Sequence, residues 1–477
     1  MTGAPTGPGR ELARKSVHVA IGGAALLLRW LTPWQAAFLA VAAVVFNLFV
    51  LHRVTRHALL RDGERPGGFS WGIALYPAAI LGLVVAFHGR FEIVAGAWAL
   101  LAFGDGMAAV AGVLLRGPAL PWNPQKTWAG FVAFVLYGTA TAAFLVRWTQ
   151  QGVLEAAGGD GAVAPTWIGD SFLAPGVGGR ASAAGMLLAA CAAAAIASAL
   201  AESAATRIDD NVLVPAVGGF VLWVATLVEP ALLAEASGEL AHAVVVGAAV
   251  NGALAAAALA VGGATASGAW AGWLLGTALY GFAGWRGLGM LALFFVLGTA
   301  STKLGHATKA SRGLAQEREG RRGARHAFAN ATTGVAFAFL AVATEYPGAM
   351  LAGLVAAFAT AAADTVASEI GQAYGRRHYL VTTLRRVPAG TDGAVSIAGT
   401  LAGIAAAVAM GGLAWAVGLV PAAGVAVVVA AAAFGATLES FVGATVQSAL
   451  RLNNEMLNFA NTLAGGIAAA ALFAAWS

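Results

Sequence analysis

The sequence predicts an all-α bundle of membrane-spanning helices. Hydrophobic residues make up 59% of the 477-residue chain, and charged residues only 10%. The apolar residues occur in long runs, and a helix that crosses a bilayer needs roughly 20 of them. Strands that alternate polar and apolar residues are missing, so helices and not a β-barrel must satisfy the backbone hydrogen bonds in lipid.

About fifteen apolar runs are candidates for membrane-spanning helices. They leave little chain for a water-soluble domain, and a nucleic-acid partner is not expected. We therefore expect a polytopic bundle in a lipid bilayer. The runs lie at 17–31, 34–51, 72–88, 93–115, 128–148, 183–201, 212–228, 241–261, 265–282, 287–302, 327–344, 348–365, 394–418, 421–437 and 460–476.

The basic residues indicate which helix ends face the cytoplasm. If the runs alternate sides, 22 of the 27 Lys and Arg residues fall in loops on one face. By the positive-inside rule that face is cytoplasmic, with the N-terminus inside and the C-terminus outside. We therefore expect a multi-pass protein of a bacterial inner membrane, with sites that face the cytoplasm.

A polar stretch near 229–241 divides the chain. Seven runs precede it and eight follow it, and each half carries its own polar motifs. We therefore expect two membrane domains, 1–235 and 236–477. The single cysteine, Cys191, lies inside an Ala-rich run, which excludes an intramolecular disulfide and a cysteine-based metal site.

Acidic residues of the first half point to a metal site. Asp105 lies inside an apolar run with a glycine on each side. A charge there is costly without a partner, and a divalent cation is one good partner. Asp209 and Asp210 offer hard oxygen ligands of the kind that Mg²⁺ prefers. A helix kink at Asp105 and a solvated helix end at Asp209 and Asp210 are the simpler alternatives.

Lys126 and Thr127 stand just before an apolar run, where a cation and a helix N-terminus together suit a phosphate group. The G-x-x-x-x-G-K-[ST] pattern of a Walker A loop is absent. A lysine that only fixes topology, and a packed His18 at the membrane interface, are the alternatives. Because these residues coincide on one face, we favour a site for a charged ligand.

Four motifs stand in order in the first half: RKSVH at 14–18, FGDGMA at 103–108, PWNPQKTWAG at 121–130 and ESAATRIDDNVLVP at 202–215. Over about residues 11–228 they resemble the phytol kinase and dolichol kinase family, which is related to the phosphatidate cytidylyltransferases. The resemblance implies a membrane kinase that phosphorylates an isoprenoid alcohol with a nucleoside triphosphate, commonly CTP.

The same resemblance implies a nucleotide–Mg²⁺ site in the first half. Asp105 and Lys126 are its expected catalytic residues. The expected metal ligands are Asp105, Glu202, Asp209 and Asp210. The expected nucleotide-binding residues are Lys15, His18, Asn123, Lys126 and Thr127.

The second half has a separate set of polar residues. Asp364 lies in an apolar run, and Ser368 shares its helix face. Glu369 lies about 140° from Asp364 on an ideal helix. The two carboxylates therefore meet one ion only if the helix ends or bends there.

Arg385 and Arg386 precede a Gly-x-x-Gly turn that leads toward an apolar run. Cations, flexible backbone N–H groups and a helix N-terminus together form a plausible cradle for phosphate. Gly390, Asp392 and Gly393 belong to this turn. A simple turn at the membrane edge is the alternative.

The segments ADTVASEIG at 363–371, TTLRRVPAGTDGAVS at 382–396 and ESFVGATVQ at 439–447 resemble a second family over roughly 241–470. This family includes plant phytyl-phosphate kinase and animal transmembrane protein 19. The resemblance implies phosphorylation of an isoprenyl monophosphate to the diphosphate. The site residues expected here are Asp364, Arg386 and Asp392 for catalysis, Asp364, Glu369 and Glu439 for the metal, and Arg385, Arg386, Gly390, Gly393, Asn453 and Asn454 for the nucleotide.

We therefore expect a fusion of two membrane kinases that use Mg²⁺ and CTP, ATP or another nucleoside triphosphate. The substrates would be an isoprenoid alcohol such as phytol, geranylgeraniol or farnesol, and then its monophosphate. One alternative is a transporter or flippase of a phosphorylated isoprenoid lipid. Another is a CTP-dependent cytidylyltransferase that acts on a lipid phosphate.

Overall fold

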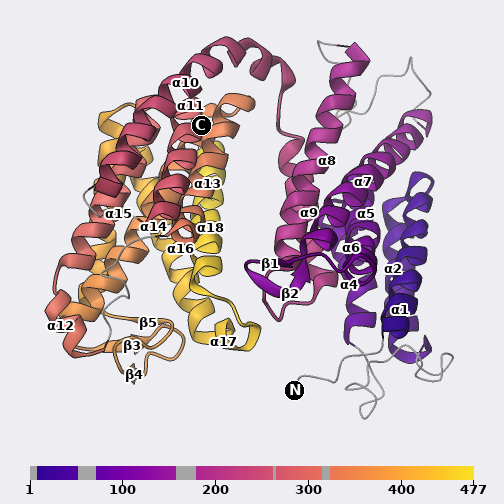
Figure 1. Ribbon diagram of the computed structural model, residues 1–477, viewed down its shortest axis with the longest axis horizontal. Helices are drawn as coiled ribbons and strands as arrows, with labels where there is room; N and C mark the ends of the chain where they lie inside the picture. Colours follow the sequence, from indigo (N-terminus) through magenta and orange to yellow (C-terminus); the bar gives the residue numbers. More distant parts are fainter. Residues whose placement is uncertain (1–7, 52–70, 157–178, 261–264, 314–322, 477) are drawn as a thin grey trace. The chain divides into compact units, whose positions relative to one another are not determined.

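The computed structural model describes residues 8–51, 71–156, 179–260, 265–313 and 323–476, and the statements below concern these residues. The described chain is all-α, with short strands only in connections between helices (Figure 1). Ten helices are long and apolar enough to cross a membrane, and three shorter apolar helices accompany them. The predicted class, an all-α polytopic bundle, is confirmed. The chain divides into two compact units, Met1–Val228 and Glu229–Ser477.

The first unit is a bundle of apolar helices with one short β-hairpin. Its elements in chain order are α1 (Pro8–Gly22), the 3₁₀ helix η1 (Gly23–Arg29), α2 (Pro33–Phe49), α4 (Trp71–Ala86), α5 (Phe91–Ala99), the π-helical turn η3 (Leu100–Gly104), α6 (Asp105–Leu115), β1 (Ala119–Leu120), β2 (Asn123–Thr127), α7 (Trp128–Ala156), α8 (Gly179–Ser203) and α9 (Asp210–Ala225).

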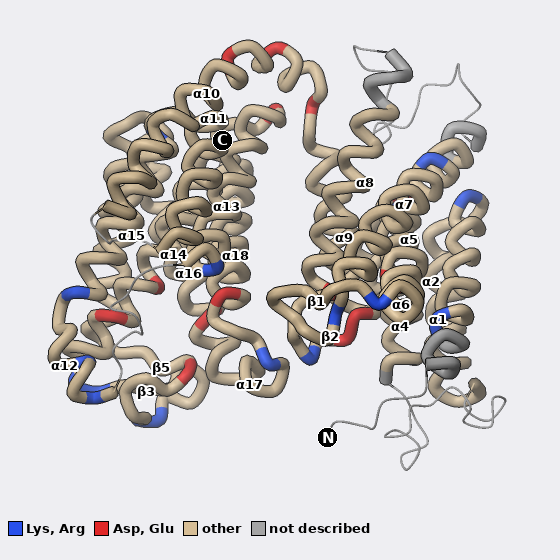
Figure 2. Tube along the Cα trace, in the orientation of Figure 1, with Lys and Arg blue, Asp and Glu red and all other residues tan. Residues whose placement is uncertain are grey.

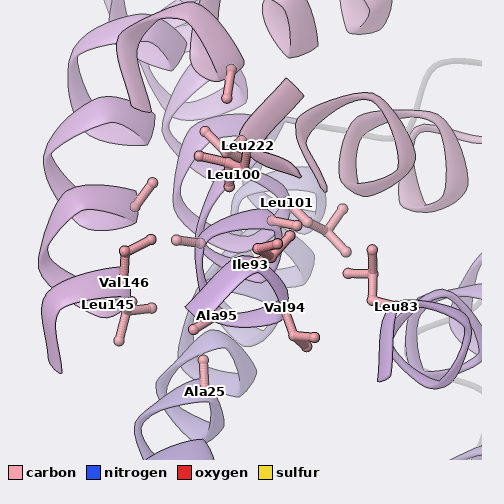
Figure 3. Packing of buried hydrophobic residues seen from close by; sticks show 14 of the residues in the cluster. Ala25, Leu83, Ile93, Val94, Ala95, Leu100, Leu101, Leu145, Val146 and Leu222 are labelled. Atoms are coloured by element: carbon pink, nitrogen blue, oxygen red, sulfur yellow. The ribbon is translucent and has the colours of Figure 1, made fainter. Parts of the chain in front are cut away.

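The hydrophobic core of the first unit is centred on α5 and η3. Ile93, Leu100 and Leu101 are fully buried there. Their cluster includes Val146 of α7 and Leu222 of α9 (Figure 3). Aliphatic side chains of this size each contribute about 1.5–3 kcal/mol when they leave water, and in lipid they contribute mainly by close packing. This core holds the start of α6 in place.

A π-helical turn joins α5 to α6. It spans Leu100–Gly104 and ends directly before Asp105. At Gly104 a β-carbon would lie 2.8 Å from Phe134 Cε1, so the absence of a side chain lets the turn pack against α7. π-helical turns are rare and are found frequently at functional sites. This turn sets the point from which the Asp105 side chain enters the bundle.

The second unit is also a helical bundle. Its elements in chain order are α10 (Pro230–Ala260), α11 (Ala266–Lys303), α12 (His306–Ser311), α13 (Ala324–Ala343), α14 (Pro347–Tyr374), β3 (His378–Leu380), β4 (Arg386–Val387), β5 (Ala394–Val395), α15 (Ile397–Ala416), α16 (Gly424–Thr445), α17 (Gln447–Leu450) and α18 (Asn454–Trp476).

Helix α14 forms the centre of the second unit. It packs against α11, α13, α15, α16 and α18. Every residue from Ala352 to Ala363 is buried. At Gly465 of α18 a β-carbon would overlap Thr360 Oγ1, so the two backbones approach closely there. Small residues at helix contacts are typical of membrane bundles, and they explain the abundance of alanine and glycine.

Helix α11 reverses direction at Gly284, which has φ 60° and ψ −159°. Before Gly284, its ring contacts advance along α13 from Phe328 to Phe339. After it, its contacts advance along α14 from Phe358 to Glu369. Because α13 and α14 are antiparallel neighbours, the two halves of α11 are antiparallel too. The expected runs 265–282 and 287–302 therefore form one helical hairpin.

The start of α10 differs from the prediction. The expected run begins at 241, whereas the helix begins at Pro230. Proline suits the first turn of a helix because its missing N–H is not needed there. The Ala, Leu and Glu residues that follow favour helix. Glu235 and Glu239, expected in a connection, therefore lie on the first turns of α10.

The short strands of each unit lie at one end of its bundle (Figure 1). Strands β1 and β2 form an antiparallel hairpin in the first unit, and β4, β3 and β5 form a sheet in that order in the second. The acidic segments of the first unit lie mostly at the end that carries β1 and β2, and the basic segments of the second mostly at the end that carries α12, β3 and α17 (Figure 2). This grouping agrees with the sidedness expected within each half.

The reversal of α11 can be tested by cysteine labelling in a Cys191→Ala background. We expect Ser267→Cys and Leu304→Cys to react with a membrane-impermeant maleimide from one side of the membrane, and Trp285→Cys from the other. The reason is that the turn and the two ends of α11 lie at opposite ends of the bundle. A straight helix of this length would bury position 285 in lipid, so a failure of Trp285→Cys to react from either side would contradict the hairpin.

Candidate functional site

Three carboxylates meet at one end of the first unit. Asp105 opens α6, Glu202 lies on the last turn of α8, and Asp210 opens α9. Their ligand oxygens all lie within 4.8 Å of one another. Opposite ligands of a hard cation are roughly 4–5 Å apart, so this spacing suits Mg²⁺ or a similar ion after small adjustments. Among the described residues, these three carboxylates are the one group of acidic, His or Cys side chains that lie close enough together to hold a metal ion.

Basic side chains neutralise this acidic group. Lys15 of α1 donates a hydrogen bond of 2.5 Å to Asp105, and both side chains are almost fully buried. His18 Nε2 lies 3.6 Å from the same carboxylate and 3.0 Å from the Leu101 carbonyl oxygen. Lys126 of β2 forms an ion pair with Glu202. Buried charges are tolerated when they are paired in this way.

The charge state of Lys126 follows from its surroundings. Burial alone lowers the pKa of its ammonium group, but the carboxylates of Glu202 and Asp210 outweigh this effect and raise the pKa above its ordinary value. Lys126 therefore stays charged in the folded protein. The stability from this pairing is present below the ordinary lysine pKa and is lost only as the pH rises through the raised value.

The β1–β2 hairpin fixes Lys126 against the end of α8. Asn123 donates to the Ser203 carbonyl oxygen at 3.0 Å, and Trp122 donates to the Ser203 hydroxyl at 3.0 Å. Thr127, expected to contact a nucleotide, accepts a hydrogen bond from the Gly130 N–H at 3.2 Å and so caps the start of α7. These contacts therefore fix the hairpin, and the hairpin holds Lys126 beside the end of α8.

Asp209 lies outside the three-carboxylate group. It is the N-cap of α9, where its side chain accepts from the backbone N–H of Asn211 at 2.9 Å and from the Asn211 amide at 2.7 Å. Aspartate is among the preferred N-cap residues. Of the two neighbouring aspartates that were expected to bind metal, the structure therefore brings only Asp210 to the group.

The second unit contains a cavity of about 400 Å³. One part of its lining, called the floor here, is polar and surrounds Asp364 and Glu439. The other part, called the upper wall, lies on α15 and α16 and is mostly apolar. The floor includes Asp364 of α14, Glu439 of α16 and Asn458 of α18. A hollow with a few convergent polar groups and an apolar wall is typical of a binding site.

Two acidic side chains form the centre of this floor. The Asp364 and Glu439 carboxyl groups lie in close contact with each other. The Asn461 amide also donates to Glu439. Two carboxyl groups in contact need a shared proton or a cation between them. Their oxygens and the Asn461 side chain are ligands of the hard type that Mg²⁺ prefers.

Glu369 does not join this pair. Helix α14 continues without a break to Tyr374, and Glu369 lines the same cavity while its carboxylate contacts α11 and α12. It forms a buried ion pair with Lys309 and accepts from the Thr302 hydroxyl at 3.3 Å. The helix end or bend that one shared ion would require between Asp364 and Glu369 is therefore absent, and Glu369 as a metal ligand stays a prediction.

The expected phosphate cradle is arranged differently. Arg385 and Arg386 are exposed, and neither lines the cavity. Gly390 and Gly393 have φ of 83° and 72°, conformations that favour glycine. Strand β5 separates this turn from α15, so the turn does not enter the helix directly. Asp392 does line the cavity.

Gly393 has a packing role that the sequence did not reveal. A β-carbon there would lie 2.5 Å from the backbone nitrogen of Ala444, so only glycine lets the turn rest on α16.

At the start of α18, Asn453 accepts from the Met456 N–H at 2.8 Å, and Asn454 accepts from the Gln447 amide at 3.2 Å. Asn454 lines the cavity, whereas Asn453 caps the helix.

Several polar residues of the second site were not predicted from the sequence. Asn461 stands inside the run 460–476, and a buried amide in an apolar run could have indicated it. Lys309 carried no such signal, because it lies in a basic segment. His378 lines the cavity and bonds the Gly371 carbonyl oxygen at 3.0 Å, again without a recognisable pattern in the sequence.

Comparison with known proteins identifies one family match and several similar membrane proteins. Residues 249–466 match the family described as integral membrane protein DUF92. A membrane protein of Synechocystis sp. is 41% identical over 197 residues, which are 40% of this chain and 76% of that protein. The chloroplastic protein VTE6 of Arabidopsis thaliana is 38% identical over 211 residues, 43% of this chain and 63% of VTE6. A membrane protein of Methanocaldococcus jannaschii is 32% identical over 197 residues, 41% of this chain and 79% of that protein. No solved structure matches the chain.

Neighbouring aspartates provide a matched test of the acidic group. In an Asp364→Asn background, which removes a carboxylate from the second unit, we expect Asp210→Asn to weaken Mn²⁺ binding roughly tenfold or more. Even outer-shell partners of metal sites contribute about 10- to 100-fold. Asp209→Asn should bind as the background does, since asparagine still caps α9. Electron paramagnetic resonance titration measures both, and equal losses would show that the three-carboxylate group is not the metal site.

Proposed function

The chain belongs to the DUF92 family of integral membrane proteins, and we propose that it is a membrane kinase of prenyl substrates. In this proposal the second unit phosphorylates a prenyl monophosphate to the diphosphate, and the first unit supplies that monophosphate from the alcohol. The observation that carries the proposal is the cavity of the second unit, in which a polar floor lies beside an apolar wall. A prenyl phosphate has the same division into a charged head and an apolar tail.

The sequence relationships support a kinase of prenyl phosphates in the second unit. Its motifs resemble the family of plant phytyl-phosphate kinase, and the chain is 38% identical to chloroplastic VTE6 over the matched residues. Asp364 and Glu439 belong to these motifs and meet in the cavity floor. The site and the resemblance therefore point to the same chemistry.

The proposed reaction of the second unit is a phosphoryl transfer. An oxygen of the prenyl phosphate attacks the terminal phosphorus of a nucleoside triphosphate, a new P–O bond forms, and the nucleoside diphosphate leaves. Asp364, Glu439 and Asn461 would hold a Mg²⁺ ion, which supplies neutralisation of the phosphate charge. The polar floor would position the two phosphate groups, and positioning is the main contribution that proteins make to this reaction.

The first unit is proposed to phosphorylate the alcohol. Asp105, Glu202 and Asp210 would hold Mg²⁺, and Lys15 and Lys126 would exchange carboxylate contacts for phosphate contacts. Asp105 is the candidate to accept the proton of the alcohol as its oxygen attacks phosphorus. The monophosphate remains in the same membrane as the second unit, so the fusion would raise its effective concentration.

The nucleotide and the orientation are further parts of the proposal. CTP is the expected donor in the first unit by resemblance, with ATP or another nucleoside triphosphate as the alternative. Both sites would face the cytoplasm of a bacterial inner membrane, because the basic loops favour that side. A transporter would be expected to carry its charged groups near the middle of the helices, whereas Glu202 and Asp210 of the first unit lie at helix ends.

Product analysis tests the proposal and separates it from the alternatives. Purified protein in lipid is incubated with phytol, geranylgeraniol or farnesol and each nucleoside triphosphate, and the products are resolved by mass. Monophosphate and diphosphate together with nucleoside diphosphate support the two kinases. Pyrophosphate release would identify a cytidylyltransferase, and prenyl phosphate that crosses a vesicle membrane unchanged would identify a transporter.

The first unit should act independently of the second. We expect Asp105→Asn or Lys126→Ala to reduce phosphorylation of the alcohol roughly a hundredfold or more, because each removes charge stabilisation of the transferring group. Conversion of supplied prenyl monophosphate to the diphosphate should stay unchanged, and mass spectrometry of both products measures it. Equal loss of both activities would refute separate sites.

The second unit gives the converse prediction. Asp364→Asn or Glu439→Gln should slow formation of the diphosphate roughly a hundredfold, so that monophosphate accumulates from the alcohol. Glu345→Gln, an exposed carboxylate between α13 and α14, is the matched control and should behave as the wild type. Undiminished diphosphate from the Asp364→Asn protein would remove the kinase role of the second unit.

A further inference from the structure

The cavity of the second unit extends well beyond its carboxylates. On α16 its lining runs from Glu439 to Val429, and on α15 from Gly399 to Ala407. At 1.5 Å per residue these segments rise roughly 15 Å and 12 Å along the helices. The cavity is therefore deeper than a phosphate group needs.

Ala407 and Val429 lie at the same level on opposite walls. Helices α15 and α16 are antiparallel neighbours, and Gly411 of α15 is level with Val425 of α16. If the antiparallel pairing continues, the residues four positions closer to the polar end on each helix are Ala407 and Val429. These two residues therefore lie opposite each other, and both line the cavity. These two side chains mark its far end.

The helices close the cavity one turn above this level. At Gly411 a β-carbon would lie 3.0 Å from Val425 Cγ1, so the two backbones are close together there. Met410 and Val428, on the same turns, are fully buried. The cavity therefore ends at Ala407 and Val429 and does not continue along the bundle.

The upper part of the cavity is lined by small or apolar side chains. Ala407 lines this part of the cavity and is only 1% exposed, so its small side chain lies at the closed end. Ile404 lines the same wall and is 41% exposed, so part of its side chain is accessible at this level. An apolar wall that continues from a polar floor matches an amphiphile whose head binds at the carboxylates.

We propose that this upper part holds the isoprenoid tail of the phosphorylated substrate, and that Ala407 and Val429 set the length of tail that fits. The inference rests on the proposed function of the second unit and specifies how its substrate is selected. A water-soluble phosphate would leave the apolar wall without a partner, whereas an isoprenoid chain would cover it. The closed end at Gly411 limits the chain length.

A larger side chain at the far end should exclude long tails. Ala407→Phe fills the space between α15 and α16, so the ratio of kcat/KM for geranylgeranyl phosphate over geranyl phosphate should fall roughly tenfold or more. Val429→Ala enlarges the same space and should shift the ratio the other way. Val408→Phe is the matched control, since Val408 follows Ala407 on α15 but is 49% exposed and does not line the cavity.

Binding without nucleotide separates this inference from the proposed function. Each variant in lipid nanodiscs is titrated with geranyl, farnesyl and geranylgeranyl phosphate, and the quenching of tryptophan fluorescence gives affinity. Loss of affinity for the longest tail in Ala407→Phe, with the shortest retained, supports the inference even if no phosphoryl transfer occurs. Equal effects on all three lengths, or the same effect in Val408→Phe, would overturn it. If Ala407→Phe unfolds at a lower temperature than the wild type, Val429→Ala alone decides.

Discussion

Burial of charge among apolar helices is the constraint on which the arrangement of each unit depends. An unpaired charge in such surroundings is strongly unfavourable, so every buried carboxylate needs a partner from another element. In the first unit Lys15 brings α1 to Asp105, and Lys126 brings the β1–β2 hairpin to Glu202. In the second, Lys309 brings α12 to Glu369. These pairs determine which elements meet around the buried carboxylates.

Small residues make these meetings possible. The glycine at 104 lets the π-helical turn rest against Phe134, which places Asp105 at its end. Gly393 plays the same part in the second unit, where the turn before β5 packs directly on α16. In both units a position without a side chain brings a turn against a helix. The high alanine and glycine content is therefore a condition for the sites as well as for membrane packing.

The two candidate sites differ in how the negative charge of their carboxylates is balanced. In the first unit three carboxylates are already balanced by two lysines and His18, so a ligand would have to exchange these contacts. In the second, Asp364 and Glu439 face each other with an amide nearby, and Lys309 is engaged with Glu369. The second site also has a defined hydrophobic chamber beside it.

The sequence by itself determined the class of this protein and much of its polar inventory. Long apolar runs dictate helices in lipid, and isolated acidic residues within them, such as Asp105 and Asp364, stand out because burying them is costly. The helix hairpin of α11 was also visible as two separate runs.

What the sequence did not determine is which polar groups meet. Asp209 and Asp210 are adjacent in the chain, yet one caps a helix and the other joins the carboxylate group. Glu369 and Asp364 lie five residues apart, yet they face different neighbours. Only the tertiary structure decided these roles, because the direction of a side chain from a helix has meaning only once the neighbouring helices are in place.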